Sequence, residues 1–338
     1  MLLQETEKST GGPIPEGPKL SEIMTARDGI LLVHKPLHLT SHDVVDSIRE
    51  LLKTKKVGHF GTLDPLATGL LLIAVGKATR LFPFFSKHDK TYRGRIRLGF
   101  STDTFDTEGK PMSSESKSYP DQIKLEQAMR SFLGKIDQIP PPYSAKKHRG
   151  RPMYAYARQN KQIKTQPIRV VIHSFQLLAY EPPHIDVDVH CSSGTYIRSL
   201  AHDLGQALGC GAHLARLERT AIGSFSIDKS YRLEDLKTLV QKNNYEAFLI
   251  PLESLLPEMS KIILKESGQI LAQNGNMIFA ENIQKAVPPD KFSSYAQSED
   301  QTYRLFSPEG SLIAFARKDP DGNGLHPFLV IDTVVSDK

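Results

Sequence analysis

The sequence predicts an α+β fold, with a mixed, largely antiparallel central sheet, flanking helices and a small β-rich module at the C-terminus. Helix-like and strand-like segments are interspersed without a regular β–α–β repeat, which disfavours a parallel sheet. Hydrophobic residues make up 39% of the chain and charged residues 24%, which is enough apolar material for a sizeable core. A change of composition over residues 251–260 marks the start of the small module.

The domain organisation follows from length and composition. A chain of 338 residues suggests one large domain and one small one. Residues 1–27 are polar and rich in Gly and Pro, so we expect a mostly disordered leader there. We expect the large domain over residues 28–255 and the small one over residues 256–338.

The large domain begins with three predicted elements. A short apolar run predicts a strand at residues 29–33. Apolar residues at helical spacing predict a helix over residues 41–52, with Ser41 as its N-cap. The run at residues 70–75 is long and apolar enough for a buried strand.

Residues 92–100 alternate between two faces, a pattern typical of a half-buried strand. Arg93, Arg95 and Arg97 share the solvent face. Later elements are a helix over residues 125–132, an alternating strand at 185–191, a helix over 197–208 with Gly209 as its C-cap, a hairpin at 305–312 and a closing β-rich segment at 328–335.

The charge distribution indicates more than the formal net charge of +5. Asp64 is the only acidic residue between Glu50 and Asp89, and no acidic residue lies between Asp137 and Glu181. These basic stretches are either a solvated face or a surface for phosphates, and binding to phosphates would weaken steeply with salt. The two cysteines show no CxxC spacing, and we find neither a membrane span nor a secretion signal, so we expect a cytoplasmic protein.

The most distinctive segment is Gly-His-Phe-Gly-Thr-Leu-Asp-Pro-Leu-Ala-Thr-Gly at residues 58–69. Its three glycines permit close backbone approach to a ligand, or tight turns. An Asp-Pro pair most often caps a helix. Here Gly69 follows too soon for a stable helix, and the lone Asp64 among cations suits a carboxylate that stays ionised.

Two other segments contain candidate functional residues. Arg198 lies at a predicted strand-to-helix junction, where it is either a surface residue or a bidentate partner for a carboxylate. The segment Pro-Pro-Pro-Tyr-Ser-Ala-Lys-Lys at residues 140–147 interleaves aromatic and basic residues. Such a composition suits RNA, because rings stack on bases while Lys and Arg contact phosphates.

The sequence contains no strong signal for a metal or a cofactor. His34, His38, His42 and His59 cluster, but neither HExxH nor paired cysteines accompany them. The acidic residues at 103–108 lack the spacing of a calcium loop, and we find no nucleotide-binding or GxSxG motif. We therefore expect no metal and no cofactor.

Together these segments resemble the TruB family of tRNA pseudouridine synthases over residues 28–255. The resemblance rests on residues 58–72, Lys35-Pro36 with Thr40-Ser41, Lys90-Thr91-Tyr92, Thr102-Asp103-Thr104 before Asp106, Tyr143-Ser144-Ala145 and residues 194–198. It implies the pseudouridine synthase fold, with a PUA-like RNA-binding module as the small domain. The Tyr143 segment resembles the stand-alone bacterial type.

The resemblance also implies the function and the roles of residues. The enzyme would isomerise the uridine at position 55, in the T arm of tRNA, after flipping it out of the stack, as a monomer without a cofactor. Asp64 would be the catalytic aspartate, Arg198 its partner, and Tyr92 a residue that stacks on the target base. Substrate contacts would come from His59, Lys35, Pro36, Gly61, Thr62, Leu63, Tyr196 and Leu200, and from Tyr143, Lys146, Lys147, Arg149 and Arg151 in a loop over residues 139–166.

Two positions depart from the family pattern. The family usually has Gly two residues after the Lys-Pro pair, where this chain has His38. It often has Gly after an Ala-Arg pair, where Gln159 follows Arg158. Both departures concern loop geometry.

Two other functions are compatible with parts of this sequence. A non-catalytic tRNA-binding or folding chaperone could use the same basic surface, but a pure RNA binder has no need of a lone carboxylate such as Asp64. A phosphatase with an Asp nucleophile would require a second Asp two residues on, where this chain has Leu66.

Overall fold

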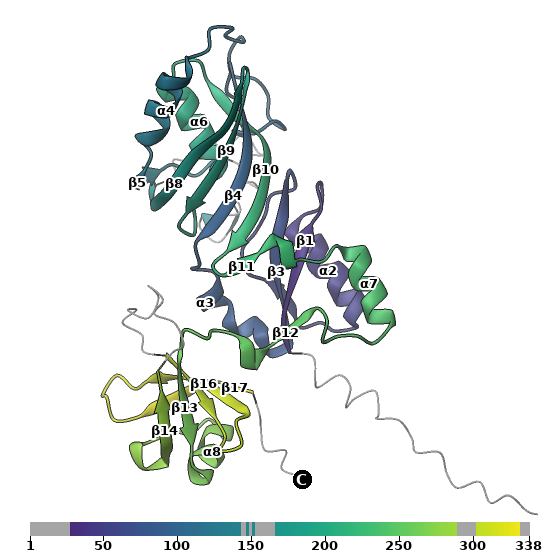
Figure 1. Ribbon diagram of the computed structural model, residues 1–338, viewed down its shortest axis with the longest axis vertical. Coiled ribbons are helices and arrows are strands. Elements are labelled where there is room, and N and C mark those ends of the chain that lie inside the picture. The colour runs from purple at the N-terminus through teal and green to yellow at the C-terminus, as the bar shows by residue number, and fades with distance from the viewer. Residues whose placement is uncertain (1–27, 143–146, 149–150, 153–165, 289–301, 332–338) are drawn as a thin grey trace, which may run out of the picture.

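The computed structural model describes residues 28–142, 147–148, 151–152, 166–288 and 302–331. A ten-stranded sheet forms the centre of the larger part (Figure 1). Its main path runs β12 (Leu249–Pro251), β1 (Gly29–Lys35), β3 (Ala67–Val75), β10 (Ala212–Ile222), β4 (Lys90–Leu98), β9 (His184–Cys191), β8 (Ile168–Glu181), β5 (Gly134–Gln138). Two short strands, β2 (Val57–His59) and β11 (Phe225–Ser226), pair with β3 and β10.

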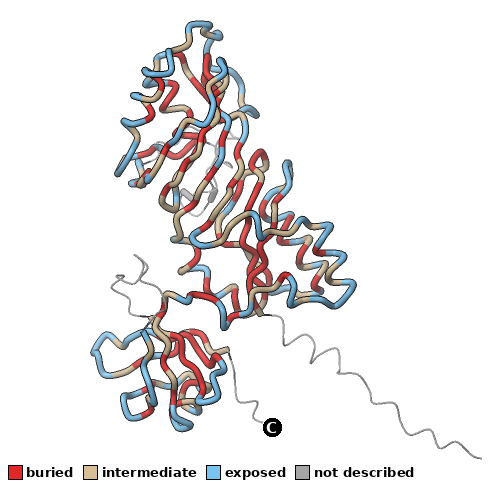
Figure 2. The backbone as a smooth tube through the Cα atoms, viewed as in Figure 1, coloured by how far each residue is buried: buried red, intermediate tan, exposed pale blue. Residues whose placement is uncertain are grey.

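The sheet is largely antiparallel, as the sequence predicts. Among its described pairings only β3 with β10 is parallel, where Gly69 lies opposite Arg219. This parallel pair brings the strand that follows Asp64 beside the strand that carries Arg219. Buried residues run along the strands, as Figure 2 shows.

Helices cover the sheet in two groups. Helices α4 (Gln122–Arg130) and α6 (Ile197–Ala207) pack on strands β4, β8, β9 and β10 around one apolar cluster. Helices α2 (Ser41–Leu52) and α7 (Leu233–Gln241) pack on β1 and β3 around another. The short helices are η1 (Gly76–Leu81), α3 (Phe82–Phe85), η2 (Ile227–Lys229) and η3 (Leu252–Ser254).

The start of helix α2 corrects the predicted N-cap. Thr40 caps the helix: its hydroxyl accepts from the Asp43 N–H at 3.1 Å, and the Asp43 carboxylate accepts from the Thr40 N–H at 2.7 Å. This reciprocal arrangement is a capping box. Ser41 is the first helical residue and is buried, because its hydroxyl bonds to the backbone of Leu63 instead.

Strand β4 has the alternation that its sequence predicts. Lys90, Tyr92, Gly94, Ile96 and Leu98 are buried, and the arginines between them reach the opposite face. The arginines pair with acidic side chains there, including Asp186 at 2.7 Å from Arg95. One face of β4 therefore supports the core that contains Tyr92, and the other face carries an ion-pair ladder.

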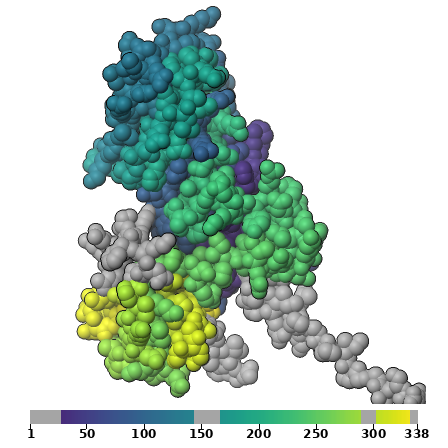
Figure 3. Space-filling view, in the orientation of Figure 1, coloured from purple at the N-terminus to yellow at the C-terminus, as the bar shows by residue number. Residues whose placement is uncertain are grey.

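A separate five-stranded sheet forms the C-terminal part, in the order β14 (Ile283–Val287), β13 (Ser260–Leu264), β15 (Thr302–Phe306), β16 (Leu312–Lys318), β17 (Leu325–Val330). Helix α8 (Glu266–Gln273) and the turn η4 (Ala280–Asn282) accompany it. The predicted hairpin is present as β15 and β16, and β17 ends at Val330. Figure 3 shows this part as a lobe against the rest of the chain.

Some predictions fall on residues outside the described ranges, namely the leader at 1–27 and the end of the last β segment beyond residue 331. Within residues 139–166, two-residue strands β6 (Lys147–His148) and β7 (Arg151–Pro152) pair with each other. Among the described helices, none is both long and apolar enough to cross a membrane.

Candidate active site

Asp64 lies in the loop between β2 and β3, and its side chain is 38% exposed. The predicted absence of a helix here is confirmed: the Ala67 N–H donates to the Asp64 carbonyl at 3.0 Å, and this turn leads directly into β3. A rigid turn beside a buried strand presents the carboxylate to solvent. Asp64 is thus accessible while its backbone is held.

Arg198 pairs with Asp64, as the sequence led us to expect. Its Nη2 lies 2.9 Å from Asp64 Oδ2. The Arg198 side chain is only 6% exposed and comes from the first turn of α6. A buried guanidinium that contacts a half-exposed carboxylate fixes the direction in which that carboxylate points.

A second carboxylate, Asp106, lies on the other side of Arg198. Its Oδ2 is 3.2 Å from Arg198 Nη1, and its side chain is 4% exposed. The Thr104 hydroxyl donates to Asp106 Oδ1 at 2.6 Å, and the Glu108 N–H donates to the same oxygen at 3.0 Å. Asp106 is therefore a fixed anion that orients Arg198. In the sequence Asp106 is recognisable only as part of a motif, and nothing there predicts this contact.

Arg219 holds the backbone of the Asp64 loop and was also missed from sequence. Its guanidinium is 1% exposed and donates to the carbonyls of Leu70 at 2.8 Å, Gly61 at 3.0 Å and Thr62 at 3.4 Å. Burial lowers the pKa of Arg219, yet a guanidinium keeps its proton in proteins. The one sequence signal for its burial is the strand spacing, because Arg219 follows the buried Leu217 by two residues.

Two further contacts fix the loop. The buried Ser41 hydroxyl accepts from the Leu63 N–H at 2.8 Å and donates to the Leu63 carbonyl at 3.1 Å. The His38 N–H donates to the Pro65 carbonyl at 2.8 Å, and His38 has φ +69°. That left-handed conformation explains why a glycine is usual at this position. This chain forms the same turn with a histidine, whose backbone is strained in that conformation.

Tyr92 lies beneath the loop in the same apolar cluster as Leu63 and is 7% exposed. Burial raises the pKa of its hydroxyl, while the charge of Arg219 works in the opposite direction. Tyr92 is therefore protonated at neutral pH and can donate a hydrogen bond.

Lys35 is a fully buried cation at the end of β1. Its Nζ donates to the carbonyls of Leu39 at 2.6 Å and Pro36 at 2.9 Å. Burial lowers the pKa of Lys35 to about 8, and the negative charge of Asp64 partly opposes this shift. Lys35 thus fixes the turn over residues 36–39, whereas Pro36 itself is exposed.

The other residues that were predicted to contact the substrate differ in how far they are buried. His59 ends β2, and burial, followed by the charge of Arg219, lowers the pKa of His59. Thr62 is exposed and Gly61 half-buried. Leu200 has no exposed surface and packs in the core under the site, so it supports the site rather than lining it.

The start of α6 is tied to the segment that precedes residue 143. The buried Gln138 side chain donates to the Tyr196 carbonyl at 3.0 Å and accepts from the Tyr196 N–H at 2.8 Å. The Ser199 hydroxyl donates to the Ile139 carbonyl at 2.7 Å. Of the loop predicted to contact RNA, Tyr143, Lys146 and Arg149 lie outside the described residues, and Lys147 and Arg151 belong to the short pair β6 and β7.

Two of the three acidic side chains at residues 103–108 bind protein groups. Asp103 accepts from the Lys110 N–H at 2.7 Å, and Asp106 pairs with Arg198. The residues that the structure describes contain one group of three metal-ligating side chains close enough to share an ion, and none of His34, His38, His42 and His59 belongs to it.

Comparison with known proteins agrees with this geometry. Residues 49–197 match the family described as "TruB family pseudouridylate synthase (N terminal domain)", and residues 198–257 match "tRNA pseudouridylate synthase B C-terminal domain". The chain is 42% identical over 248 residues to tRNA pseudouridine synthase B of Solibacter usitatus, covering 73% of this chain and 85% of the relative. It is 40% identical over 296 residues to the protein of that name from Geotalea uraniireducens, covering 88% and 93%.

Solved structures show the same fold. A chain of a Cbf5-Nop10-Gar1 complex superposes with a TM-score of 0.68 at 25% identity, covering 97% of this chain and 92% of that chain. A chain of an H/ACA RNP bound to a substrate RNA containing 2'-deoxyuridine gives 0.67 at 24% identity, covering 97% and 91%.

The fold and these matches define the class of the protein: it is a pseudouridine synthase, an enzyme that isomerises uridine to pseudouridine. The two matched regions are contiguous and span more than half of the chain. The chain belongs to the TruB family.

Proposed function

We propose that this enzyme isomerises the uridine at position 55, in the T arm of tRNA, and that Asp64 is its catalytic carboxylate. The observation that carries the proposal is the ion pair of Asp64 with Arg198, in which the arginine is 6% and the aspartate 38% exposed. A carboxylate that is both held and accessible suits a group that must reach a nucleotide. The tRNA substrate accords with the names of the relatives from Solibacter usitatus and Geotalea uraniireducens.

The reaction detaches the uracil from its ribose and rejoins it through carbon, so the base must first leave the stack. In the proposed mechanism Asp64 acts on the flipped nucleotide as an ionised carboxylate. Arg198 directs Asp64 through their ion pair, and Asp106 pairs with the other nitrogen of the Arg198 guanidinium. Tyr92 offers a ring for stacking and a hydroxyl that is protonated at neutral pH.

The remaining site residues position these groups. Arg219 and Ser41 fix the backbone just before Asp64, at Gly61 and Leu63. Lys35 fixes the turn at residues 36–39 beneath it. His59, Thr62 and Tyr196 are candidates for contacts with the RNA around the flipped base.

We also infer that residues 256–338 form a PUA-like RNA-binding domain, that residues 139–166 contact the T arm, and that the enzyme is a cytoplasmic monomer. The separate five-stranded sheet that begins at Ser260, with its own core, supports the domain assignment. Light scattering on the free protein and on its tRNA complex tests the monomer.

The decisive experiment is to incubate the protein with unmodified tRNA transcript, without added cofactors, and to map pseudouridine at single-nucleotide resolution. We expect modification at position 55 alone. Asp64→Asn should abolish it while tRNA affinity stays within about tenfold, since phosphate contacts elsewhere dominate binding. Asp46→Asn is the matched control, because Asp46 is an exposed carboxylate on α2 that pairs with Arg49.

Turnover by Asp64→Asn above a few per cent of the wild-type rate would refute the role of Asp64. Modification at another uridine would refute the T-arm assignment while leaving the class of enzyme intact. Binding without any modification by the wild type would favour the chaperone alternative.

A further inference from the structure

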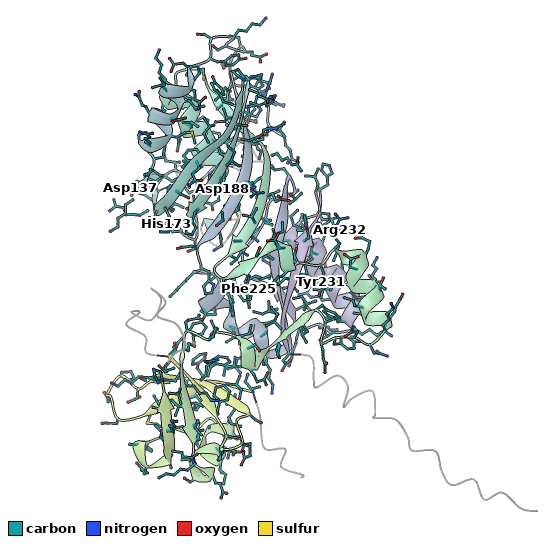
Figure 4. The ribbon with its side chains drawn as sticks, in the orientation of Figure 1. Asp137, His173, Asp188, Phe225, Tyr231 and Arg232 are labelled. Carbon is teal, nitrogen blue, oxygen red and sulfur yellow. The ribbon has the colours of Figure 1, made fainter. Side chains whose placement is uncertain are left out.

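A group of metal-ligating side chains lies at one end of the sheet, apart from the residues proposed to act on RNA. Asp89, His173 and His190 each place a ligand atom within 4.8 Å of the others. His173 Nε2 is 3.2 Å from Asp89 Oδ2, and the two imidazole rings have centroids 4.7 Å apart. Figure 4 labels His173 on β8, and Asp188 two residues before His190 on β9.

The fold brings the three residues together on the open face of the sheet. Val189 and Cys191 are buried against α6, so His190 between them projects to the opposite face. Lys90 is buried on the same side as Tyr92, so Asp89 before it also projects to the open face. The cluster and the Asp64 site therefore lie on opposite faces.

A β-bulge supplies the third side chain. Ile172 pairs with Cys191 and Ser174 pairs with His190, which leaves His173 as an extra residue in β8. The burial pattern of β8 changes phase at this point, with Val170 and Ile172 buried before it and Phe175 after it. Bulges re-aim side chains, and this one directs an exposed imidazole toward its neighbours.

The three side chains offer the kinds of ligand atom that bind late first-row divalent metal ions. Two imidazole nitrogens and one carboxylate oxygen are ligands that Zn²⁺ takes in three-ligand sites, with a fourth position left open. In a tetrahedral site with bonds of about 2.0–2.1 Å the ligand atoms are about 3.3 Å apart. The separation of 3.2 Å between His173 Nε2 and Asp89 Oδ2 already matches that edge. The ligand atom of His190 lies within 4.8 Å of the other two.

We propose that Asp89, His173 and His190 form a Zn²⁺ site on the open face of the sheet, with one coordination position open to solvent. The ion cross-links strands β9 and β8 to the residue that precedes β4. Strand β4 carries Tyr92, so the site clamps the sheet from the face opposite the Asp64 loop. Its effect is on the stability of the folded chain, because the three ligands come together only after folding.

The competing occupant is a proton. A protonated His173 would satisfy Asp89 as an ion pair, with His190 as a neutral neighbour. The two occupants differ in what they require. Zn²⁺ needs both histidines neutral. The ion pair needs only His173, in its protonated form.

The test uses the full-length protein stripped of metal by a chelator, titrated with zinc chloride at pH 7.5 by calorimetry. Single variants His173→Ala and His190→Ala should each lower Zn²⁺ affinity at least tenfold, and Zn²⁺ should raise the melting temperature of the wild type but of neither variant. His184→Ala is the matched control, because His184 lies on the same strand as His190: the Zn²⁺ affinity of this variant should stay within about twofold of wild type. Co²⁺ should give an intense visible spectrum typical of tetrahedral coordination in the wild type and in the control, but in neither of the two site variants.

Circular dichroism verifies that each variant is folded, and His173→Gln replaces His173→Ala if that variant is not. Equal affinity and stoichiometry in the wild type and a His173→Ala/His190→Ala double variant would overturn the proposal, because the bound metal would lie elsewhere. Saturation only at millimolar Zn²⁺ would also overturn it and leave the protonated ion pair as the occupant.

Discussion

Arg198 is a single buried cation between two carboxylates of different exposure. Asp106 is 4% exposed and depends on Arg198 for charge compensation, whereas Asp64 retains contact with water. Removal of one member of a buried ion pair leaves an uncompensated charge, which is strongly destabilising. The stability of this part of the site therefore rests on Arg198 with Asp106, and its chemistry on Arg198 with Asp64.

We predict that Arg198→Ala is nearly inactive and loses about 3–5 kcal/mol of unfolding free energy, because Asp106 is left unpaired. Arg198→Lys should be strongly impaired, since an ammonium cannot span both carboxylates in one plane. Asp106→Asn combined with Arg198→Met should recover most of the stability without recovering activity. Urea denaturation and single-turnover rates measure the two effects. Near-wild-type rates for Arg198→Ala would exclude the proposed orientation of Asp64.

Lys35 couples the site to pH. Burial lowers its pKa in the folded chain to about 8, from an ordinary value of 10.5. Between these values the unfolded chain binds more protons than the folded one, so unfolding takes up protons and stability rises with pH. Below pH 8 Lys35 is charged in both states and the full cost of its burial applies. Lys90 behaves alike, since burial lowers its pKa to about 8 as well.

We therefore predict that Lys35→Met reduces the rise of stability between pH 8 and 9.5 by the equivalent of up to about one proton. The measurement is chemical denaturation at several pH values in that window. Lys90→Met should reduce the slope by a similar amount, and both losses should add because the two lysines bond to different carbonyls. An unchanged slope in Lys35→Met would mean that Lys35 keeps an ordinary pKa in the folded protein.

At the level of elements, the periodicity of apolar residues predicted the secondary structure of individual segments and which face of each is buried. The alternation in β4 and the helical spacing in α6 depend on one buried face, which a sequence displays. The N-cap of α2 was placed one residue late because Thr40 and Ser41 are both good caps. The choice between them depends on Leu63, which claims the Ser41 hydroxyl from 22 residues away.

The contacts that sequence could not reveal are those made between elements. Arg219 is buried because three carbonyls from another strand and its preceding loop converge on it. Asp106 acquires its role when the loop after β4 meets the start of α6. Neither contact produces a periodic pattern in the sequence. From the sequence alone, Arg219 and Asp106 therefore look like ordinary surface residues.

The backbone conformation and the close contact at Gly69 can be tested by substitution. Its φ is +103°, and a Cβ there would lie 2.4 Å from the Arg219 carbonyl oxygen. We predict that Gly69→Ala costs about 2–4 kcal/mol, from strain and from displacement of β10. Activity should fall further than stability alone explains, because β10 carries the guanidinium that holds the Gly61 carbonyl.

Gly58→Ala is the matched control for that variant. The nearest atom to its Cβ is a Thr79 methyl group at 3.8 Å, an ordinary contact. Its cost in urea denaturation should stay below about 1 kcal/mol. Equal costs for the two variants would show that β10 does not require glycine at residue 69.

Over the whole molecule, the two sheets share an apolar cluster rather than only a connecting segment. Phe306, Leu312, Phe315 and Leu329 of the C-terminal sheet belong to the same cluster as Phe60 and Phe85. Phe328 stacks on Phe84 at 5.5 Å between centroids, and its carbonyl accepts from Arg80 at 2.6 Å. These contacts fix the orientation of the C-terminal part relative to the larger sheet.

The distribution of charge over the molecule is the basis on which we expect phosphates to bind at some residues and not at others. The strand arginines form ion pairs with acidic side chains: Arg95 with Asp186 at 2.7 Å, Arg97 with Glu115 at 2.8 Å, and Arg169 with Asp137 at 2.9 Å. Figure 4 labels Asp137. Their charges are largely compensated. The acid-free stretch between Asp137 and Glu181 has a surplus of positive charge instead.

We predict that changing Lys146, Lys147, Arg149 and Arg151 together to Gln weakens tRNA binding and flattens its dependence on salt. Each lost phosphate contact should reduce the slope of log affinity against log salt by about 0.7 to 0.9. The control changes Arg95 and Arg97 to Gln, and it should leave the slope nearly unaltered because their charges are already paired. Filter binding across a range of potassium chloride concentrations measures both. A slope that falls in the control but not in the loop variant would place the phosphates on the open face of the sheet and contradict the assignment of residues 139–166 to the T arm.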